Sequence, residues 1–149
     1  MTTLAYNKRA NFDYEILEKY EAGLILTGQE VKSVRTGHIS LKGSFVTIKG
    51  NEMFLTNATI SPYAPAGEIK GYDPTRPRKL LLKRSEIASL IGKSRAQGLT
   101  MVPIRVYTRK RFLKLEFGLG KGKKEFDKRA KIQKRESERD IKRMLKNRI

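Results

Sequence analysis

The chain has 149 residues, and its 33 lysines and arginines outnumber its 15 aspartates and glutamates, which gives a formal net charge of +18 at neutral pH. This length suits one domain, and an apolar fraction of 38% supports a core while leaving part of the chain outside it. The absence of cysteine excludes a disulfide framework, and a single histidine leaves almost no ligands for zinc or bases for a catalytic triad. An excess of positive charge this large indicates a polyanionic partner, either nucleic acid or an acidic membrane surface.

Neither a membrane span nor a secretion signal is predicted. No apolar run approaches the roughly 20 residues that cross a bilayer. The N-terminal sequence MTTLAYNKRANFDYEILEK lacks the apolar stretch of a signal peptide. We therefore expect a cytoplasmic protein.

The first third of the chain predicts strands followed by a capped helix. An imperfect alternation over residues 12–17 and a short apolar run over residues 24–26 indicate strands. Thr27 followed by Glu30 has the spacing of a capping box, and Gly37 stands where a glycine ends a helix. We therefore expect a helix between Thr27 and Gly37.

The middle of the chain predicts a hairpin and then a long loop. Residues 44–48 and 53–58 are rich in β-forming side chains and are separated by a short polar segment, which is typical of an antiparallel hairpin. Residues 61–77 contain four prolines and two glycines, so we expect a loop there. A long ordered loop in a compact domain is usually functional.

The last part of the body predicts a strand, a helix and a second hairpin. Three leucines at 80–82 indicate a buried strand, and residues 85–98 have the pattern of a helix that ends at a glycine. Residues 100–107 and 112–119 flank a short turn, and alternate residues of the second arm are apolar. Short antiparallel strands with interposed helices predict a mainly β fold, a small antiparallel β-barrel that is closed or partly open, with flanking helices.

The charge is divided between two predicted units. Residues 1–119 carry 20 basic and 10 acidic side chains, a net charge of +10, and residues 120–149 carry 13 basic and 5 acidic side chains, a net charge of +8. Glycines stand at alternate positions between them, at Gly118, Gly120 and Gly122. We interpret these as a hinge between a globular body, 1–119, and a basic C-terminal tail, 120–149.

The sequence offers little support for catalysis. The stretch GLGKGKKE has neither the glycine spacing nor the hydroxyl of a phosphate-binding loop, and its glycines do not match the dinucleotide fingerprint. Glu15, Glu18 and Glu21 cluster, so a two-carboxylate hydrolase remains an alternative, but a solvated face accounts for them better because no accompanying catalytic pattern is present. We expect a protein that is not an enzyme and holds no metal or other cofactor.

Basic clusters in the predicted body point to RNA. Single-stranded or looped RNA is held by contacts to phosphate together with stacking on aromatic side chains, and Tyr20, Tyr63 and Tyr72 fall near these clusters. The clusters are Asn7, Lys8 and Arg9; Lys32 and Arg35; and Arg76, Arg78 and Lys79.

The tail has the pattern of a helix with too little apolar surface to pack on the body. Pairs such as Glu125 with Arg129 and Glu138 with Lys142 place an acid four residues before a base, which supports a helix. The apolar stripe is interrupted by Gln133. We therefore expect a tail that is disordered when free and becomes helical on a polyanion, whereas an interfacial membrane helix requires a continuous apolar face.

Six motifs are spread over nearly the whole chain, and their combination is highly specific. They are NKRA (7–10), DYEILEKYEAGLILTGQEVKSVRTG (13–37), ISPY (60–63), DPTRPRKLLL (73–82), GKGKKEFDKR (120–129) and RDIKRMLK (139–146). Together these motifs resemble the SsrA-binding protein family, also called small protein B.

The resemblance implies a barrel related to the oligonucleotide-binding fold. It also implies that the body binds the tRNA-like domain of transfer-messenger RNA and delivers this RNA to stalled ribosomes for trans-translation, the rescue process that adds a peptide tag. Asn7, Glu21 and Leu81 match the RNA-binding surface of the body. The tail would sense the empty messenger RNA channel of the small ribosomal subunit and become helical there. We expect a monomer when free. The tail residues that match the decoding site and channel are Lys123, Lys124, Phe126, Asp127, Lys128, Arg129, Met144 and Leu145.

Two other functions remain as alternatives. A generic single-strand binder of the oligonucleotide-binding type would bind unstructured RNA about as well as a structured elbow. A nuclease would cleave RNA with or without magnesium.

Overall fold

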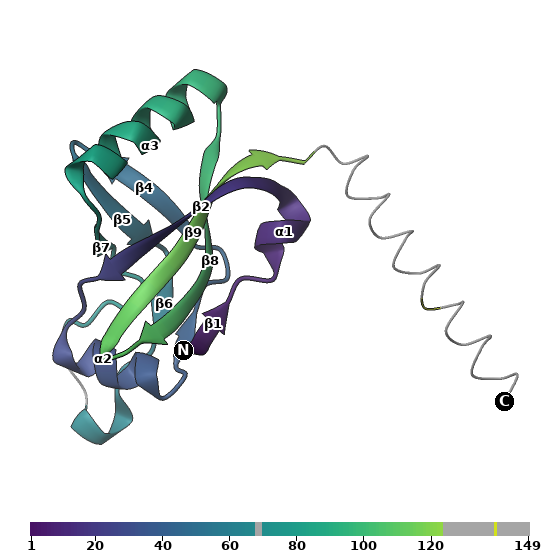
Figure 1. Cartoon of the computed structure of the whole chain (residues 1–149). Coiled ribbons are helices and arrows are strands. Elements are labelled where there is room, and N and C mark those ends of the chain that lie inside the picture. The colour runs from purple at the N-terminus through teal and green to yellow at the C-terminus, as the bar shows by residue number, and fades with distance from the viewer. Residues whose placement is uncertain (68–69, 124–138, 140–149) are drawn as a thin grey trace, which may run out of the picture.

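The computed structural model describes residues 1–67, 70–123 and 139 of the chain (Figure 1). The strands are β1 (Thr2–Tyr6), β2 (Tyr14–Leu24), β3 (Ile39–Ser40), β4 (Phe45–Lys49), β5 (Glu52–Thr56), β6 (Thr59–Ile60), β7 (Arg78–Leu81), β8 (Thr100–Arg109) and β9 (Phe112–Gly122). The helices are α1 (Arg9–Asp13), α2 (Gly28–Arg35) and α3 (Arg84–Gln97), and a 3₁₀ turn, η1, spans Ala64–Ala66. The mainly β class expected from the sequence is confirmed.

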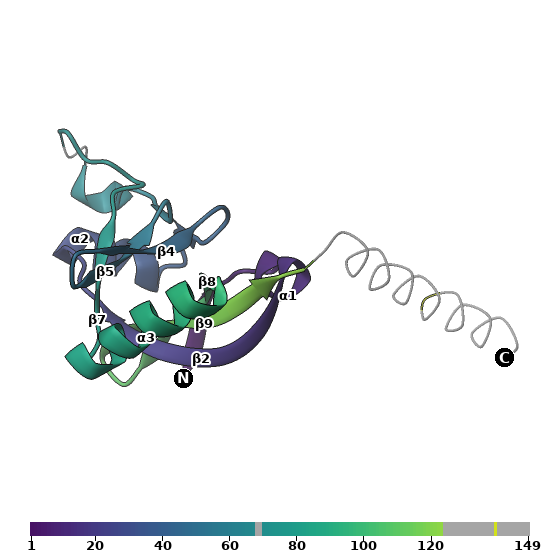
Figure 2. The ribbon, with the colours of Figure 1, turned by 90° about the horizontal axis from the view of Figure 1, so that it is seen from above.

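Seven strands form one antiparallel sheet in the order β1-β8-β9-β2-β7-β5-β4. The sheet curls, so that β4 and β5 face the β8–β9 hairpin (Figure 2). In the part of the chain that the structure describes, no ladder joins the edge strands β1 and β4, so the sheet does not close into a barrel. Its edge at β1 instead contacts β3, which pairs with β6 in a separate two-stranded ribbon.

The core fills the inside of the curled sheet. On β9 the alternate residues Leu113, Leu115, Phe117 and Leu119 are all buried, as the period of two predicts. Phe117 stacks against Tyr20 of β2, with ring centroids 5.7 Å apart. Burying one large apolar side chain contributes about 1.5 to 3 kcal/mol, so this face is a major source of stability.

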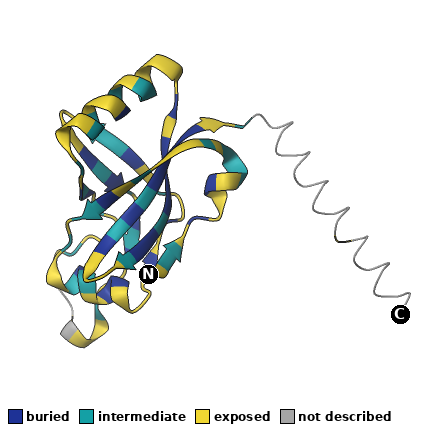
Figure 3. Cartoon of the chain, in the orientation of Figure 1, coloured by how far each residue is buried: buried dark blue, intermediate teal, exposed yellow. Residues whose placement is uncertain are grey.

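The two longer helices begin and end where local sequence predicts. The Thr27 side chain accepts a hydrogen bond from the Glu30 amide at 3.2 Å, and the Glu30 carboxylate accepts one from the Thr27 amide at 3.1 Å, which completes the capping box of α2. α3 ends at Gly98, whose φ of +61° is left-handed. Figure 1 shows α2 and α3 at opposite ends of the curled sheet, and most of α3 is exposed (Figure 3).

The proposed glycine hinge is wrong for the described residues. β9 continues through the glycines to Gly122, and Gly118 and Gly120 pair with Lys19 and Ile16 of β2. A Cβ atom at Gly118 would lie 2.6 Å from Cγ2 of Ile16. The glycines therefore allow close packing of β2 on β9, and the ordered pairing passes the predicted boundary at residue 119.

The expected first strand is also partly wrong. Residues 9–13 form the short helix α1, and β2 begins at Tyr14 and continues to Leu24. The Asn7 side chain holds the start of α1 by accepting a hydrogen bond from the Arg9 amide at 3.2 Å.

Candidate nucleic-acid interface

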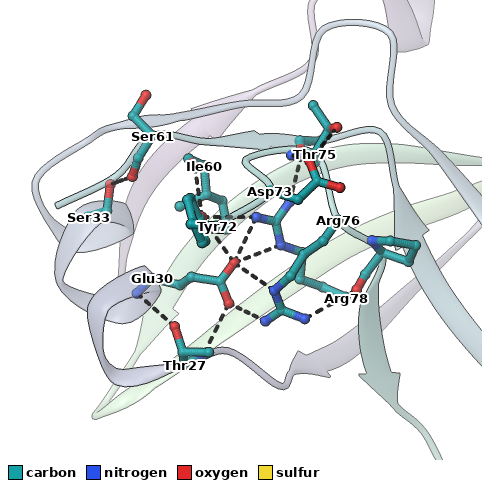
Figure 4. A network of polar contacts seen from close by, with 12 residues as sticks. Thr27, Glu30, Ser33, Ile60, Ser61, Tyr72, Asp73, Thr75, Arg76 and Arg78 are labelled. Carbon is teal, nitrogen blue, oxygen red and sulfur yellow. Dashed lines mark hydrogen bonds and ion pairs between the residues drawn. The ribbon is translucent and has the colours of Figure 1, made fainter. Parts of the chain in front are cut away.

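A buried ionic cluster fastens the long proline-containing loop to α2 and β7 (Figure 4). Its centre is Glu30, whose side chain is only 1% exposed. Arg78 donates to Oε2 of Glu30 from Nη2 at 2.7 Å and from Nε at 3.0 Å, and Arg76 donates from Nε at 3.1 Å. The Tyr72 hydroxyl donates to the carbonyl oxygen of Ile60 at 2.8 Å and accepts from Nη2 of Arg78.

The electrostatics of the cluster keep Glu30 ionised. Burial raises the pKa of the Glu30 carboxyl, but hydrogen bonds from Arg76, Thr27 and Arg78 outweigh burial and lower the pKa to about 2. Burial of an ionised carboxylate is unfavourable by itself, and the two guanidinium partners of Glu30 compensate for that cost. The cluster therefore has a structural role in holding the loop.

This cluster corrects one predicted RNA contact. Arg78 is fully buried, and its Nη1 donates to the carbonyl oxygen of Ala58 at 2.7 Å, so it cannot meet a phosphate at the surface. On β7 it shares the inward face with Leu80, two residues along. Arg76 has a side chain that is 34% exposed, but its guanidinium is paired with Glu30.

The predicted cluster at the N-terminus lies beside α1. Asn7 is only 8% exposed, and its Nδ2 donates to the carbonyl oxygen of Pro103 at 2.8 Å, so its amide anchors α1 to β8. Lys8 and Arg9 are exposed, and Arg9 pairs with Asp13 at 3.2 Å. Lys8 and Arg9 are therefore exposed at this end of the body, whereas the Asn7 side chain forms hydrogen bonds within the fold.

Lys123, predicted as part of the tail, also lies at this end of the body. Its Nζ donates to the carbonyl oxygen of Asn11 at 2.7 Å, and its amide donates to the carbonyl oxygen of Asp13 at 2.9 Å. The other predicted tail residues, Lys124, Phe126, Asp127, Lys128, Arg129, Met144 and Leu145, lie outside the residues that the structure describes.

A second basic region surrounds the turn between β8 and β9, at the opposite end of that hairpin. Nη2 of Arg35 on α2 donates to the carbonyl oxygen of Arg111 at 2.7 Å, which places the end of α2 against the turn. Phe112 is 66% exposed. We call this surface the hairpin-tip patch, and it comprises Arg35, Arg109, Lys110, Arg111, Phe112 and Lys114.

Sequence reasoning found only Arg35 of the hairpin-tip patch. The run RKRF at residues 109–112 was available as an indication, because it places three consecutive cations and an aromatic side chain at a predicted turn. In the predicted hairpin Arg109 to Arg111 fall in the turn and Phe112 begins the second arm, and that prediction rests on the strand pattern and not on the charge of the turn.

Glu21 anchors the patch. Its carboxylate accepts hydrogen bonds from the hydroxyl of Tyr107 and, at 3.1 Å, from Nη1 of Arg109. The Tyr107 hydrogen bond lowers the pKa of Glu21 and outweighs burial, with Arg109 adding to the effect. Burial and the Glu21 carboxylate raise the pKa of Tyr107. Glu21 therefore fixes the position of Arg109 at the base of the turn.

The remaining predicted body residues lie on α2 and β7. Lys32 on α2 lies with Nζ 5.8 Å from the ring centroid of Tyr63. Lys79 forms an exposed pair with Glu52 at 3.3 Å. Leu81 is 55% exposed, which is unusual for a leucine in a central strand, and it lines two hollows, one towards α3 and one towards the β8–β9 turn.

The described residues contain no group of three or more His, Asp or Glu side chains that could hold a metal ion. Among them, no helix is long and apolar enough to cross a membrane.

The model of the SmpB protein family matches residues 4–147 of the chain. The chain belongs to the SmpB family. This confirms the resemblance seen in the sequence. The chain is also similar to the SsrA-binding protein of Chloroflexus aggregans, at 48% identity over 149 residues, covering 100% of this chain and 94% of that protein. The SsrA-binding protein of Streptococcus mutans is 51% identical over 143 residues, covering 96% of this chain and 92% of that protein.

A solved SmpB structure also matches this fold. It is described as "tmRNA-SmpB: a journey to the center of the bacterial ribosome", and it is 46% identical to this chain with a TM-score of 0.66. The match covers 80% of this chain and 84% of the solved one. The fold match therefore agrees with the family shown by the sequence.

Proposed function

We propose that this SmpB family member binds the tRNA-like domain of transfer-messenger RNA and delivers that RNA to stalled ribosomes for trans-translation. The observation that carries the proposal is the match, at 46% identity, to a solved chain described as part of a tmRNA–SmpB assembly. The names of the relatives, SsrA-binding proteins, agree with it.

The body has the properties that recognition of a folded RNA requires. Its curled antiparallel sheet supports a relation to the oligonucleotide-binding fold, whose strands and loops form nucleic-acid surfaces. Exposed cations lie at both ends of the β8–β9 hairpin, at Lys8 and Arg9 and in the hairpin-tip patch. Phosphate contacts at two separate points orient an RNA elbow without any chemical step.

The tail completes the proposed function at the ribosome. The segment that follows the ordered body, residues 124–149, carries 11 basic and 5 acidic side chains, a net charge of +6. In the proposal it binds ribosomal RNA by neutralising phosphates, and it can do so only where messenger RNA leaves the channel empty. Lys124 begins this segment, Phe126 to Arg129 meet the decoding site, and Met144 and Leu145 lie deeper in the channel. Peptide transfer belongs to the ribosome, so the chain acts as a binding protein, not as an enzyme, and works in the cytoplasm.

Competition binding with the full chain tests this proposal. A labelled tRNA-like domain is displaced either by the same unlabelled RNA or by an unstructured RNA of equal length at fixed salt. We expect the structured RNA to compete at least tenfold better. Equal competition would identify a generic single-strand binder, and cleavage of either RNA with or without magnesium would identify a nuclease.

A pull-down from a bacterial lysate gives an unbiased second test. The full chain is used as bait, and the bound RNA is sequenced. We expect transfer-messenger RNA to be enriched over transfer RNA and ribosomal RNA fragments. Enrichment of other RNAs in its place would refute the proposed partner.

A further inference from the structure

An open hollow of about 630 Å³ lies beside α1, at the opposite end of β8 from the hairpin-tip patch. Its walls are α1, the segment 42–46 that leads into β4, and the first residues of β8, and we call it the α1 groove. Val46, Met101 and Val102 give it a buried apolar lining, and Phe45, which also lines it, remains 45% exposed. A hollow lined in this way has room for one further apolar side chain.

β9 leads the chain directly to the α1 groove (Figure 1). The Lys123 amide donates to the carbonyl oxygen of Asp13 at 2.9 Å, and Asp13 itself lines the groove. Phe126, three residues further on, is the sole aromatic residue after position 123 in the sequence. Three extended residues reach about 10 Å, whereas the five residues of α1 span about 7.5 Å. Phe126 can therefore reach the groove while the pairing of β9 with β2 stays intact.

Charge also matches this segment to the groove. Lys42 lines the groove, is exposed and forms no ion pair with another described residue. Asp13, the one carboxylate in the described lining, already pairs with Arg9. Glu125 and Asp127 stand on either side of the phenylalanine, and no other part of the sequence 124–149 combines an aromatic ring with carboxylates. A basic body attracts this part of a tail that is otherwise mostly basic.

We infer that Phe126 binds in the α1 groove, against Phe45, while the chain is off the ribosome, with a flanking carboxylate near Lys42. The inference rests on the proposed function and deepens it, because Phe126 to Arg129 are the residues proposed to meet the decoding site. Their position against the body keeps this motif from other RNA until the ribosome competes for it.

The inferred contact is short and reversible. It involves one aromatic side chain, which agrees with a tail that has too little apolar surface to pack on the body along its length. Because few residues join Phe126 to β9, the effective concentration of its ring at the groove is of the order of millimolar. A weak contact is therefore occupied in the free chain, and ribosomal RNA displaces it by making phosphate contacts along the whole tail.

Fluorescence of a single tryptophan tests the contact, because the sequence contains none. In Phe126→Trp the indole is the sole tryptophan, and quenching by acrylamide measures its exposure in the full chain without RNA. We expect Phe45→Ala, added to this variant, to raise the quenching constant about threefold, the change for a ring that is docked about two thirds of the time. Lys42→Gln should raise it by a smaller factor. Phe112→Ala is the matched control, since Phe112 is also exposed but does not line the groove, and should leave quenching unchanged.

Binding to small ribosomal subunits that hold no messenger RNA provides the second readout. A tail that is free in only about one third of the chains binds with an apparent affinity reduced about threefold. We therefore expect Phe45→Ala in the full chain to bind these subunits about threefold more tightly than the unaltered chain. Its affinity for the tRNA-like domain should be unchanged.

The outcomes separate the inference from the proposed function. If Phe45→Ala leaves the quenching of Phe126→Trp unchanged, the groove contact is refuted and the proposed function stands. Protection that is lost on dilution would overturn the intramolecular contact and assign the groove to the tail of a second copy. Weaker binding of Phe45→Ala to the small subunit would overturn the competition and make the groove a direct ribosome contact. Failure of the unaltered chain to bind the tRNA-like domain would refute the proposed function, whereas quenching without RNA would still decide whether Phe126 binds the groove.

Discussion

At the scale of single residues, Glu30 shows how one carboxylate can serve two functions. It caps α2 through a contact three residues away, which the spacing of Thr27 and Glu30 predicts. It also binds Arg76 and Arg78, 46 and 48 residues further along the chain. The second function depends on where β7 joins the sheet, so no local pattern around Glu30 reveals it.

Replacing Glu30 tests the energetic importance of this cluster. We expect Glu30→Gln to lower the free energy of unfolding by about 3 to 5 kcal/mol, because the buried guanidinium of Arg78 loses its counter-charge. Chemical denaturation measures this change. Glu52→Gln is the matched control, since its pair with Lys79 is exposed, and we expect a change below about 1 kcal/mol. Similar losses for both variants would contradict a special role for the buried pair.

The pKa of Glu30 predicts a dependence of stability on acidity. Folding lowers this pKa from an ordinary 4.5 to about 2, so the stabilisation is complete above about pH 4.5 and is lost as the pH falls towards 2. A shift of this size corresponds to about 3 kcal/mol. Denaturation midpoints measured between pH 5 and 2 should decline less steeply for Glu30→Gln than for the unaltered chain. Parallel declines would show that other carboxylates control acid unfolding.

At the scale of elements, the glycines of β9 determine how closely two strands pack. A methyl group at Gly118 would meet Cγ2 of Ile16 at 2.6 Å and the carbonyl oxygen of Glu18 at 3.0 Å, whereas Gly122 has open space at that position. We expect Gly118→Ala to destabilise the fold by about 1 to 3 kcal/mol. Gly122→Ala should be neutral or stabilising by a few tenths of a kcal/mol. Equal effects in denaturation experiments would contradict the packing role.

The β8–β9 turn places a cation in a strained backbone conformation. Lys110 has a φ of +56°, a region that favours glycine, and glycine is common in two-residue hairpin turns of this kind. We expect Lys110→Gly to stabilise the fold by about 1 kcal/mol and to weaken RNA binding several-fold, because one cation of the hairpin-tip patch is lost. Lys110→Asn, which tolerates this φ, is the control for loss of charge and should weaken binding equally. Unchanged RNA affinity in both variants would separate this lysine from RNA binding.

Local patterns predicted some elements well and others poorly. The arms of the β8–β9 hairpin were predicted because they are adjacent in the chain and one arm alternates cleanly. β1 was missed because it is stabilised by pairing of Thr2 with Thr108, more than 100 residues away. α1 was missed because its sequence contains no strong cap, and its start depends on the Asn7 contacts with Arg9 and Pro103.

At the scale of the whole molecule, the candidate site was only partly predictable because assembly of the sheet decides which cations are exposed. Arg78 and Lys79 are neighbours with similar charge, yet Arg78 is buried and the Lys79 side chain is 43% exposed. Arg78 and Leu80 are two residues apart on β7 and therefore share its inward face. A count of basic residues ignores which face of a strand each residue occupies. Conversely, the proximity of α2 to the β8–β9 turn joins Arg35 to Arg111, 76 residues apart.

The division of the +18 charge between body and tail predicts separable functions. The pairing of β9 with β2 continues to Gly122, and Lys123 contacts Asp13, so a truncation that tests this division should end after Lys123 and not after residue 119. Residues 124–149 carry 11 basic and 5 acidic side chains. We expect the truncated chain to bind the tRNA-like domain within about tenfold of the full chain, because the body cations remain, and to lose tagging on stalled ribosomes.

A full-length variant with Met144→Ser and Leu145→Ser is the matched control, since it keeps the charge of the tail and removes apolar side chains near its end. We expect it to bind RNA like the unaltered chain and to tag poorly, because matching a channel requires shape as well as charge. Loss of RNA binding on truncation would place the main RNA contact in the tail. Tagging that survives both changes would show that the body alone recognises the stalled ribosome, and the two-part interpretation of the charge would then be wrong.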